Sequence, residues 1–186
     1  MINRLLLMKI HTVLAAFALP IACMFLVTGA LYTWGIKGDV SSEQYTIELQ
    51  QPLQPELDQL IDLAEVALRS HQLSTPSGGA KIKTVGDSFM LQWGGAQREV
   101  LIEPTADPGL ATLTINEASG YKVLVQLHKA KGSVLFKIYA TLFAGALLLL
   151  ILSGFIMAWQ TPKLKKMAFT ALAVSVASFI GLVLIS

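Results

Sequence analysis

Carboxylates are absent from both ends of this chain of 186 residues. All 12 acidic residues lie between Asp39 and Glu117, although the formal net charge of the whole chain is +2. The central segment, residues 38–121, has 12 acidic and 4 basic residues and therefore a net charge of −8. Because such a segment repels phosphates, the sequence excludes nucleic acid as a partner.

Cysteine and histidine are scarce as well. The single cysteine, Cys23, cannot form a disulfide within the chain, and one cysteine with three scattered histidines cannot form a zinc site. The chain also has no Gly-Lys-Ser/Thr phosphate loop and no Ser-His-Asp arrangement. These absences favour a non-enzymatic protein, and we assign no catalytic residue and no metal site.

Three long runs without charged residues fill most of the remaining sequence. They comprise the 27 residues between Lys9 and Lys37, the 25 residues between Lys137 and Lys163, and the 20 residues after Lys166. A bilayer core of about 30 Å requires about 20 apolar residues in a helix, so each run is long enough to span it. We therefore predict a membrane α-helical protein with three transmembrane helices and a small α+β extracytoplasmic domain between helices 1 and 2.

These runs also set the predicted boundaries along the chain. The predicted parts are an N-terminal segment with the first span (1–37), the α+β domain (38–120), an amphipathic membrane-proximal segment (121–132), the second span (133–160), a basic loop (161–166) and the third span (167–186).

Lysine and arginine in the short loops predict the orientation. Arg4 and Lys9 precede the first span, and the basic loop 161–166 joins the other two. Because basic short loops stay in the cytoplasm, we expect a multi-pass protein of the bacterial inner membrane with its N-terminus in the cytoplasm. The central domain and the C-terminus are then periplasmic. Cleavage at Cys23, within "LPIAC", is the alternative, but the first run exceeds the apolar core of about 7–15 residues in a typical signal peptide.

The central segment combines one helix pattern with several strand patterns. Apolar residues from Leu57 to Leu68 recur at steps of three and four, and the proline before them predicts a helix that begins at Pro55. Short alternating segments follow, among them residues 88–93 and 110–117, and they predict antiparallel strands.

Two of the three histidines stand at the starts of the first two spans. His11 follows Arg4 and Lys9, and His128 lies in an amphipathic segment whose lysines can reach water while their stems cover apolar surface. The far ends of the two spans share a pattern, "TGALYTW" at 28–34 and "SGFIMAW" at 153–159. Small residues let helix backbones approach closely, so packing and anchoring at the membrane surface are the simplest interpretation.

On these residues the chain resembles the PepSY-associated transmembrane proteins. The residues that carry the resemblance are His11 with Thr28-Gly29 in the first span, and Leu127-His128 with Ser153-Gly154 at the second. The central domain resembles a PepSY module more loosely. Larger members of the family include bacterial inner-membrane ferric-siderophore reductases that bind b-type haem through membrane histidines. The resemblance therefore implies that His11 and His128 are candidate ligands of haem b.

The chain departs from that pattern in having three spans instead of four or more, with no histidine in the third. His11 is expected near the cytoplasmic face and His128 near the other, so about 30 Å of bilayer prevents one chain from holding one haem between them. The second ligand of each haem would have to come from a parallel homodimer or from a partner protein.

Two functions therefore stay open. The favoured one is an accessory, regulatory or interaction subunit that displays an acidic domain to a membrane or periplasmic protein partner. The alternative is a haem-b-binding electron-transfer subunit linked to ferric-siderophore reduction and iron uptake. Because the sequence has no nucleotide or flavin motif, such a subunit would need an external electron donor.

Overall fold

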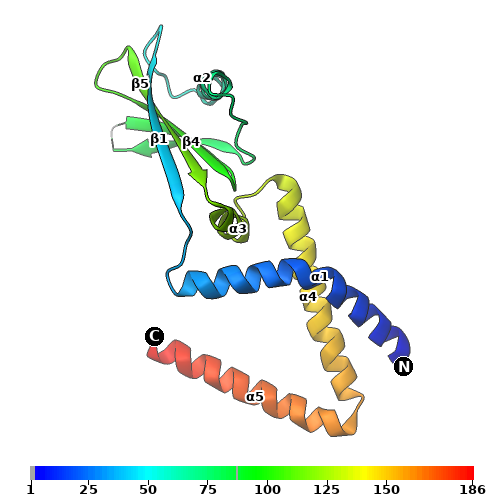
Figure 1. The fold of residues 1–186 in the computed structure, drawn as a ribbon. Coiled ribbons are helices and arrows are strands. Elements are labelled where there is room, and N and C mark those ends of the chain that lie inside the picture. The colour runs from blue at the N-terminus through cyan, green and yellow to red at the C-terminus, as the bar shows by residue number, and fades with distance from the viewer. Residues whose placement is uncertain (1–2, 87) are drawn as a thin grey trace. The chain divides into compact units, whose positions relative to one another are not determined.

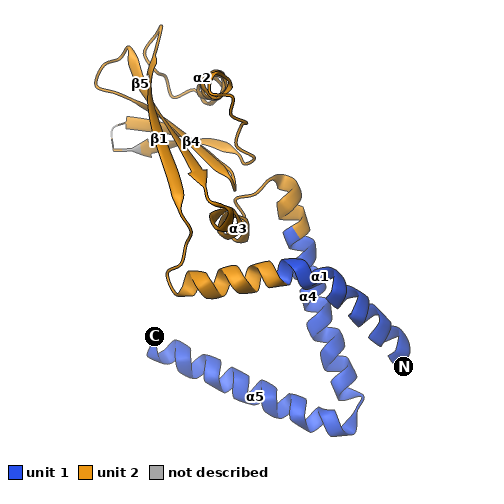
Figure 2. Ribbon diagram, in the orientation of Figure 1, with its two compact units in different colours: residues 1–22, 140–186 blue, residues 23–139 orange. Residues whose placement is uncertain are grey.

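The computed structural model describes residues 3–86 and 88–186, and Figure 1 shows the path of the chain. In chain order the elements are α1 (Arg4–Thr33), β1 (Val40–Glu48), α2 (Leu57–Ser70), β2 (Ala80–Val85), β3 (Ser88–Gly94), β4 (Arg98–Pro104), β5 (Leu110–Ala118), α3 (Gly120–His128), α4 (Val134–Trp159) and α5 (Pro162–Ile185). The chain divides into two compact units, residues 1–22 with 140–186 and residues 23–139 (Figure 2).

Three helices are long and apolar enough to cross a membrane, namely α1, α4 and α5 with 30, 26 and 24 residues. Large apolar side chains on these helices point outward, and Val13 and Leu135 are 68% and 78% exposed. Lipid tails are the surroundings that such a surface requires, because hydrocarbon solvates apolar side chains and every helical backbone group is already bonded. The predicted three apolar helices and the predicted small antiparallel sheet are both confirmed.

The unit formed by residues 1–22 and 140–186 is held together by contacts near the α4–α5 turn. The rings of Phe155 and Trp159 contact the Phe169 ring at centroid distances of 5.5 and 5.3 Å. The Lys165 ammonium lies 4.2 Å from the centroid of the Trp159 ring, and Arg4 Nη2 donates to Thr161 Oγ1 at 3.2 Å. Aromatic rings and basic groups at such a turn suit the headgroup region of a bilayer.

The sheet of the other unit has five antiparallel strands in the order β1-β5-β4-β3-β2. Strands β2 to β5 form a meander, and β1 closes it by pairing along its whole length with β5, from Val40 opposite Ala118 to Glu48 opposite Leu110. Buried and half-buried residues alternate along β4 and β5, because successive side chains of a strand point to opposite faces.

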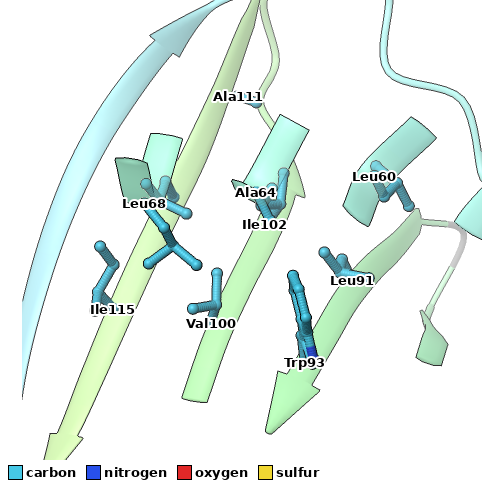
Figure 3. Packing of buried hydrophobic residues seen from close by; sticks show 10 residues of the cluster. Leu60, Ala64, Leu68, Leu91, Trp93, Val100, Ile102, Ala111 and Ile115 are labelled. Atoms are coloured by element: carbon cyan, nitrogen blue, oxygen red, sulfur yellow. The ribbon is translucent and has the colours of Figure 1, made fainter. Parts of the chain in front are cut away.

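Helix α2 covers one face of this sheet and buries the core (Figure 3). The core residues are Leu60, Ala64 and Leu68 from α2 and Leu91, Trp93, Val100, Ile102, Ala111, Leu113 and Ile115 from β3, β4 and β5. The expected helix start at Pro55 is wrong by two residues, since Glu56 is the extended N-cap and the helix begins at Leu57. The fixed φ of proline suits an extended segment as well as a first helical turn, so its position alone did not decide the boundary.

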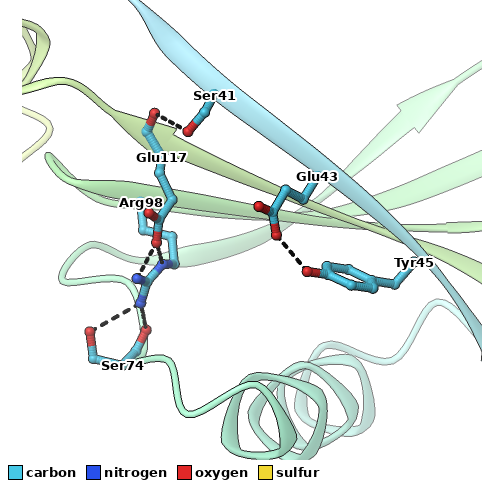
Figure 4. Close-up of polar contacts among 6 residues, drawn as sticks. All are labelled: Ser41, Glu43, Tyr45, Ser74, Arg98 and Glu117. Atoms are coloured by element: carbon cyan, nitrogen blue, oxygen red, sulfur yellow. Dashed lines mark hydrogen bonds and ion pairs between the residues drawn. The ribbon is translucent and has the colours of Figure 1, made fainter.

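Arg98 fastens the loop after α2 to the sheet (Figure 4). It is only 8% exposed, and its Nε donates to Glu117 Oε1 at 3.0 Å across β4 and β5. Its Nη1 donates to the carbonyl and the hydroxyl of Ser74. At the outer strand, the Tyr45 hydroxyl donates to a Glu43 carboxylate oxygen at 2.5 Å, and this hydrogen bond raises the pKa of Tyr45.

The packing of α2 predicts a large difference between two neighbouring positions. Leu68 is 0% exposed and Val66 is 66% exposed. We expect Leu68→Ala to lower the free energy of unfolding of this domain by about 2–5 kcal/mol, because the lost apolar burial and the new cavity add. Val66→Ala should change it by less than about 0.5 kcal/mol. Pulse proteolysis of the full chain in detergent with increasing urea measures both, and equal effects would contradict the described core.

Candidate functional site

Each of the two membrane-proximal histidines is hydrogen bonded to a hydroxyl residue of the Thr-Gly or Ser-Gly motif on another helix. His11 on α1 pairs with Ser153 on α4, inside the unit of residues 1–22 and 140–186. His128 at the end of α3 pairs with Thr28 on α1, inside the unit of residues 23–139. The two sites are therefore built alike, although they belong to different units.

At the first site the imidazole lies against a serine and the glycine that follows it. His11 Nδ1 is 2.8 Å from Ser153 Oγ, and Ser153 is 7% exposed. Ser153 Oγ in turn donates to the Leu150 carbonyl of its own helix at 3.0 Å. A Cβ atom at Gly154 would lie 3.7 Å from His11 Cε1, so a side chain larger than alanine there would compete with the ring for space.

At the second site the same parts come from different elements. His128 Nδ1 is 2.7 Å from Thr28 Oγ1, and Thr28 is 1% exposed. Thr28 Oγ1 donates to the Met24 carbonyl of its own helix at 2.6 Å. A Cβ atom at Gly29 would lie 3.4 Å from His128 Cε1, and the Phe25 ring contacts the imidazole at a centroid distance of 4.5 Å.

The contacts of the two hydroxyl groups favour one tautomer of a neutral imidazole at both sites. A hydroxyl group has one proton to donate, and both hydroxyls donate it to a backbone carbonyl of their own helix. We therefore assign each hydroxyl oxygen as the acceptor of the facing Nδ1–H. The lone pair then lies on Nε2 of His11 and of His128, which is the arrangement that metal-ligating histidines show when a second group holds the other ring nitrogen.

A small cavity adjoins the second site. It has a volume of about 230 Å³ and is lined by Thr28, Gly29, Tyr32, Val125, His128 and Lys129. The Lys129 ammonium lies 5.6 Å from the centroid of the Tyr32 ring, so this lysine has a cation–π partner besides its contact with water. The volume is below the range of about 300–1,000 Å³ that is usual for pockets enclosing a whole ligand.

The imidazole nitrogens at the two sites are suitable ligands for haem iron, but each site has only one of them. Each site offers one imidazole nitrogen, and the cavity at His128 is too small to enclose a macrocycle within this chain alone. The third histidine, His71, caps α2 and contacts the Tyr45 ring at 4.1 Å, as part of the α+β domain. Among residues 3–86 and 88–186, no group of three or more His, Cys, Asp or Glu side chains could hold a metal ion.

Sequence reasoning found the residues of both sites but not their pairing. It grouped His11 with Thr28-Gly29 and His128 with Ser153-Gly154, each group along its own span. The structure crosses these groups, because it brings His11 to Ser153 and His128 to Thr28. Consecutive spans run in opposite directions, so the start of one lies beside the end of the next, and this general rule could have predicted the crossed pairing.

Comparison with known proteins agrees with the motif evidence. The model of one protein family, described as the PepSY-associated TM region, matches residues 8–178. No curated protein and no solved structure matched the chain. The matched range contains both histidine sites and the sheet domain between them.

The tautomer assignment predicts an NMR observation. In the neutral imidazoles of protein labelled with ¹⁵N-histidine, Nδ1 of His11 and His128 should carry the proton and Nε2 should not. Thr28→Val removes the acceptor of His128 Nδ1–H, so we expect its Nε2 signal to shift toward a mixture of tautomers while that of His11 stays unchanged. Thr33→Val is the matched control, because the Thr33 hydroxyl donates to the Gly29 carbonyl. A protonated Nε2 at both sites in the unmodified chain would contradict the assignment.

Proposed function

Because the chain belongs to the PepSY-associated transmembrane family, we propose that it is a non-enzymatic accessory or interaction subunit of the bacterial inner membrane. In this proposal it displays its acidic α+β domain to a protein partner in the periplasm. The three apolar helices would anchor the domain, and Arg4, Lys9 and the basic loop 161–166 would hold the orientation in which that domain is periplasmic.

The proposal rests on one observation, the contact between the two segments that connect the α+β domain to helices α1 and α3. Asp39 and Ser119 exchange hydrogen bonds, since Asp39 N donates to Ser119 Oγ at 3.2 Å and Ser119 N donates to the Asp39 carbonyl at 3.0 Å. The Tyr121 hydroxyl donates to the Ile36 carbonyl at 3.2 Å. The chain therefore leaves α1 and enters α3 at one point, through which, in this proposal, a movement of the sheet would reach both helices.

A glycine allows these two connecting segments to approach each other closely. Gly38 has φ +73°, and a Cβ atom there would lie 2.8 Å from Lys122 N. Only glycine meets both conditions without strain. A domain that was only tethered to the helices would not require such a close approach. The contact therefore supports a role in which a partner that binds the domain affects the membrane helices.

The outer strand β1 offers the surface for a partner. It pairs with β5 on one side, and its first five residues, Val40–Gln44, are exposed. An edge strand presents unpaired N–H and C=O groups to which a partner segment can add in β-sheet fashion. The exposed Glu43 next to this edge favours a basic partner segment.

A membrane-impermeant, thiol-reactive photo-crosslinker tests both the topology and the interaction. In a Cys23→Ser background, we expect Gln44→Cys on β1 to be labelled in intact spheroplasts and to give one discrete adduct after illumination. Lys165→Cys, in the basic loop, should be labelled only after permeabilisation. Labelling of Lys165→Cys in intact spheroplasts would refute the orientation, and a labelled Gln44→Cys without an adduct would refute the interaction.

The second candidate function is a haem-b electron-transfer subunit. One specific observation favours it, because Ser153 and Thr28 fix both imidazoles with the Nε2 lone pair available. In that function His11 and His128 would hold the haem iron, the two hydroxyl residues would orient the rings, and a second copy or a partner would supply the remaining ligands. Haem would supply one-electron transfer when bound.

An absorption spectrum separates the two functions. If the chain is a non-haem accessory subunit, protein purified from haem-supplemented cells should show no Soret band. A band that is lost in the double variant His11→Ala/His128→Ala but kept in His71→Ala would establish the haem function instead. His71 is the matched control because it lies on α2 of the sheet domain.

A further inference from the structure

A second cavity, of about 400 Å³, lies within the unit of residues 23–139. Its walls come from strands β2, β3 and β4 and from the link between α3 and α4. The charged residues that line it are Lys81, Lys131, Lys137 and Glu99, with a formal net charge of +2. This charge contrasts with the net charge of −8 over residues 38–121, so the cavity is a local basic site on an acidic domain.

Glu99 is the single acidic group of the lining, and its partners hold it in place. Its Oε1 atom accepts a hydrogen bond from Gln92 Nε2 at 2.7 Å and lies 3.9 Å from Lys131 Nζ. The Glu99 carboxylate thus offsets the charge of Lys131 and positions its ammonium group. Lys81 and Lys137 are the other two basic residues of the lining and add to the positive charge of the cavity.

Backbone forms part of the cavity wall, because side chains do not fit there. A Cβ atom at Gly78 would lie 2.2 Å from the Gly94 carbonyl oxygen, and one at Gly132 would lie 2.8 Å from Leu127 Cδ2. The Gly94 backbone at Gly78 and the Leu127 side chain at Gly132 therefore leave little room for a Cβ atom at these two positions of the cavity wall. A group of several atoms, such as a phosphate with its ester substituents, matches this size and charge.

The cavity adjoins the start of a membrane span. Lys131 and Gly132 lie in the short link before α4, and Lys137 lies in its first turn. A helix of 26 residues is about 39 Å long, more than the hydrocarbon core of about 30 Å, so its first turn lies at the level of the lipid headgroups. Val134 and Leu135 in that turn are 70% and 78% exposed and offer an apolar surface to lipid tails.

We propose that this cavity binds the phosphate of an anionic phospholipid headgroup, with Lys81, Lys131 and Lys137 as its cationic ligands. Basic pockets beside transmembrane helices recognise anionic headgroups in this manner, and each lysine near the membrane surface contributes about fivefold to binding. The bound lipid then joins the sheet to α4 through its headgroup, at the side of the domain where Lys131 already pairs with Glu99.

Native mass spectrometry of the full chain released from detergent tests the proposal. With added phosphatidylglycerol we expect a retained lipid, with phosphatidylcholine much less retention, and with glycerol 3-phosphate none, because the tails contribute to binding. The triple variant Lys81→Gln/Lys131→Gln/Lys137→Gln should lose retention of phosphatidylglycerol on the order of tenfold or more. The matched control Lys37→Gln/Lys122→Gln/Lys129→Gln removes the same charge from residues outside the cavity lining and should keep it.

Equal losses in both triple variants would overturn the proposal, because they would indicate attraction to general positive charge. Equal retention of glycerol 3-phosphate and phosphatidylglycerol would overturn the lipid as the source of the phosphate. Glu99→Gln provides a test that does not depend on the folding of the triple variant. It keeps an acceptor for Gln92 and removes the charge that offsets Lys131, so retention of phosphatidylglycerol should increase, and an unchanged or lower value would contradict the assigned site.

Discussion

A hydroxyl group has one proton to donate, and the two histidine sites depend on where that proton goes. Ser153 and Thr28 are buried on apolar helices, where a backbone carbonyl of the same helix takes the proton. The oxygen is left as an acceptor, and an imidazole that donates to it through Nδ1 satisfies both groups. In hydrocarbon, such mutual satisfaction is the condition under which a polar side chain is tolerated at a helix contact.

The glycine after each hydroxyl residue completes the same arrangement. Gly154 and Gly29 leave room for the imidazole ring beside the helix backbone, at van der Waals distance from a would-be Cβ atom. A histidine, a hydroxyl residue and a glycine therefore form one small contact motif between helices. The chain contains this contact motif twice, with its parts in crossed order. This explains why the two histidines and the two short motifs occur at the ends of the apolar runs.

The α+β domain is built by ordinary burial and then fixed to its helices by a few polar contacts. Its core follows from one apolar face of α2 and from the alternation of β3, β4 and β5. Its attachment depends on the Asp39–Ser119 exchange and on the close approach at Gly38. The acidic α+β domain and the basic cavity beside the start of α4 are thus parts of one unit.

The sequence by itself determined the three apolar helices, the antiparallel sheet and the residues of both histidine sites. Hydrophobic length, strand alternation and short motifs are local properties, and a reader of the sequence can evaluate each within a few turns of helix or one strand. The tertiary structure alone decided the crossed pairing of His11 with Ser153 and of His128 with Thr28, and it alone gathered Lys81, Lys131 and Lys137 around one cavity. His11 and Ser153 are 142 positions apart, Thr28 and His128 are 100 apart, and Lys81 lies about 50 positions before Lys131. Only side-chain packing and hydrogen bonding in three dimensions select among the alternatives at such separations.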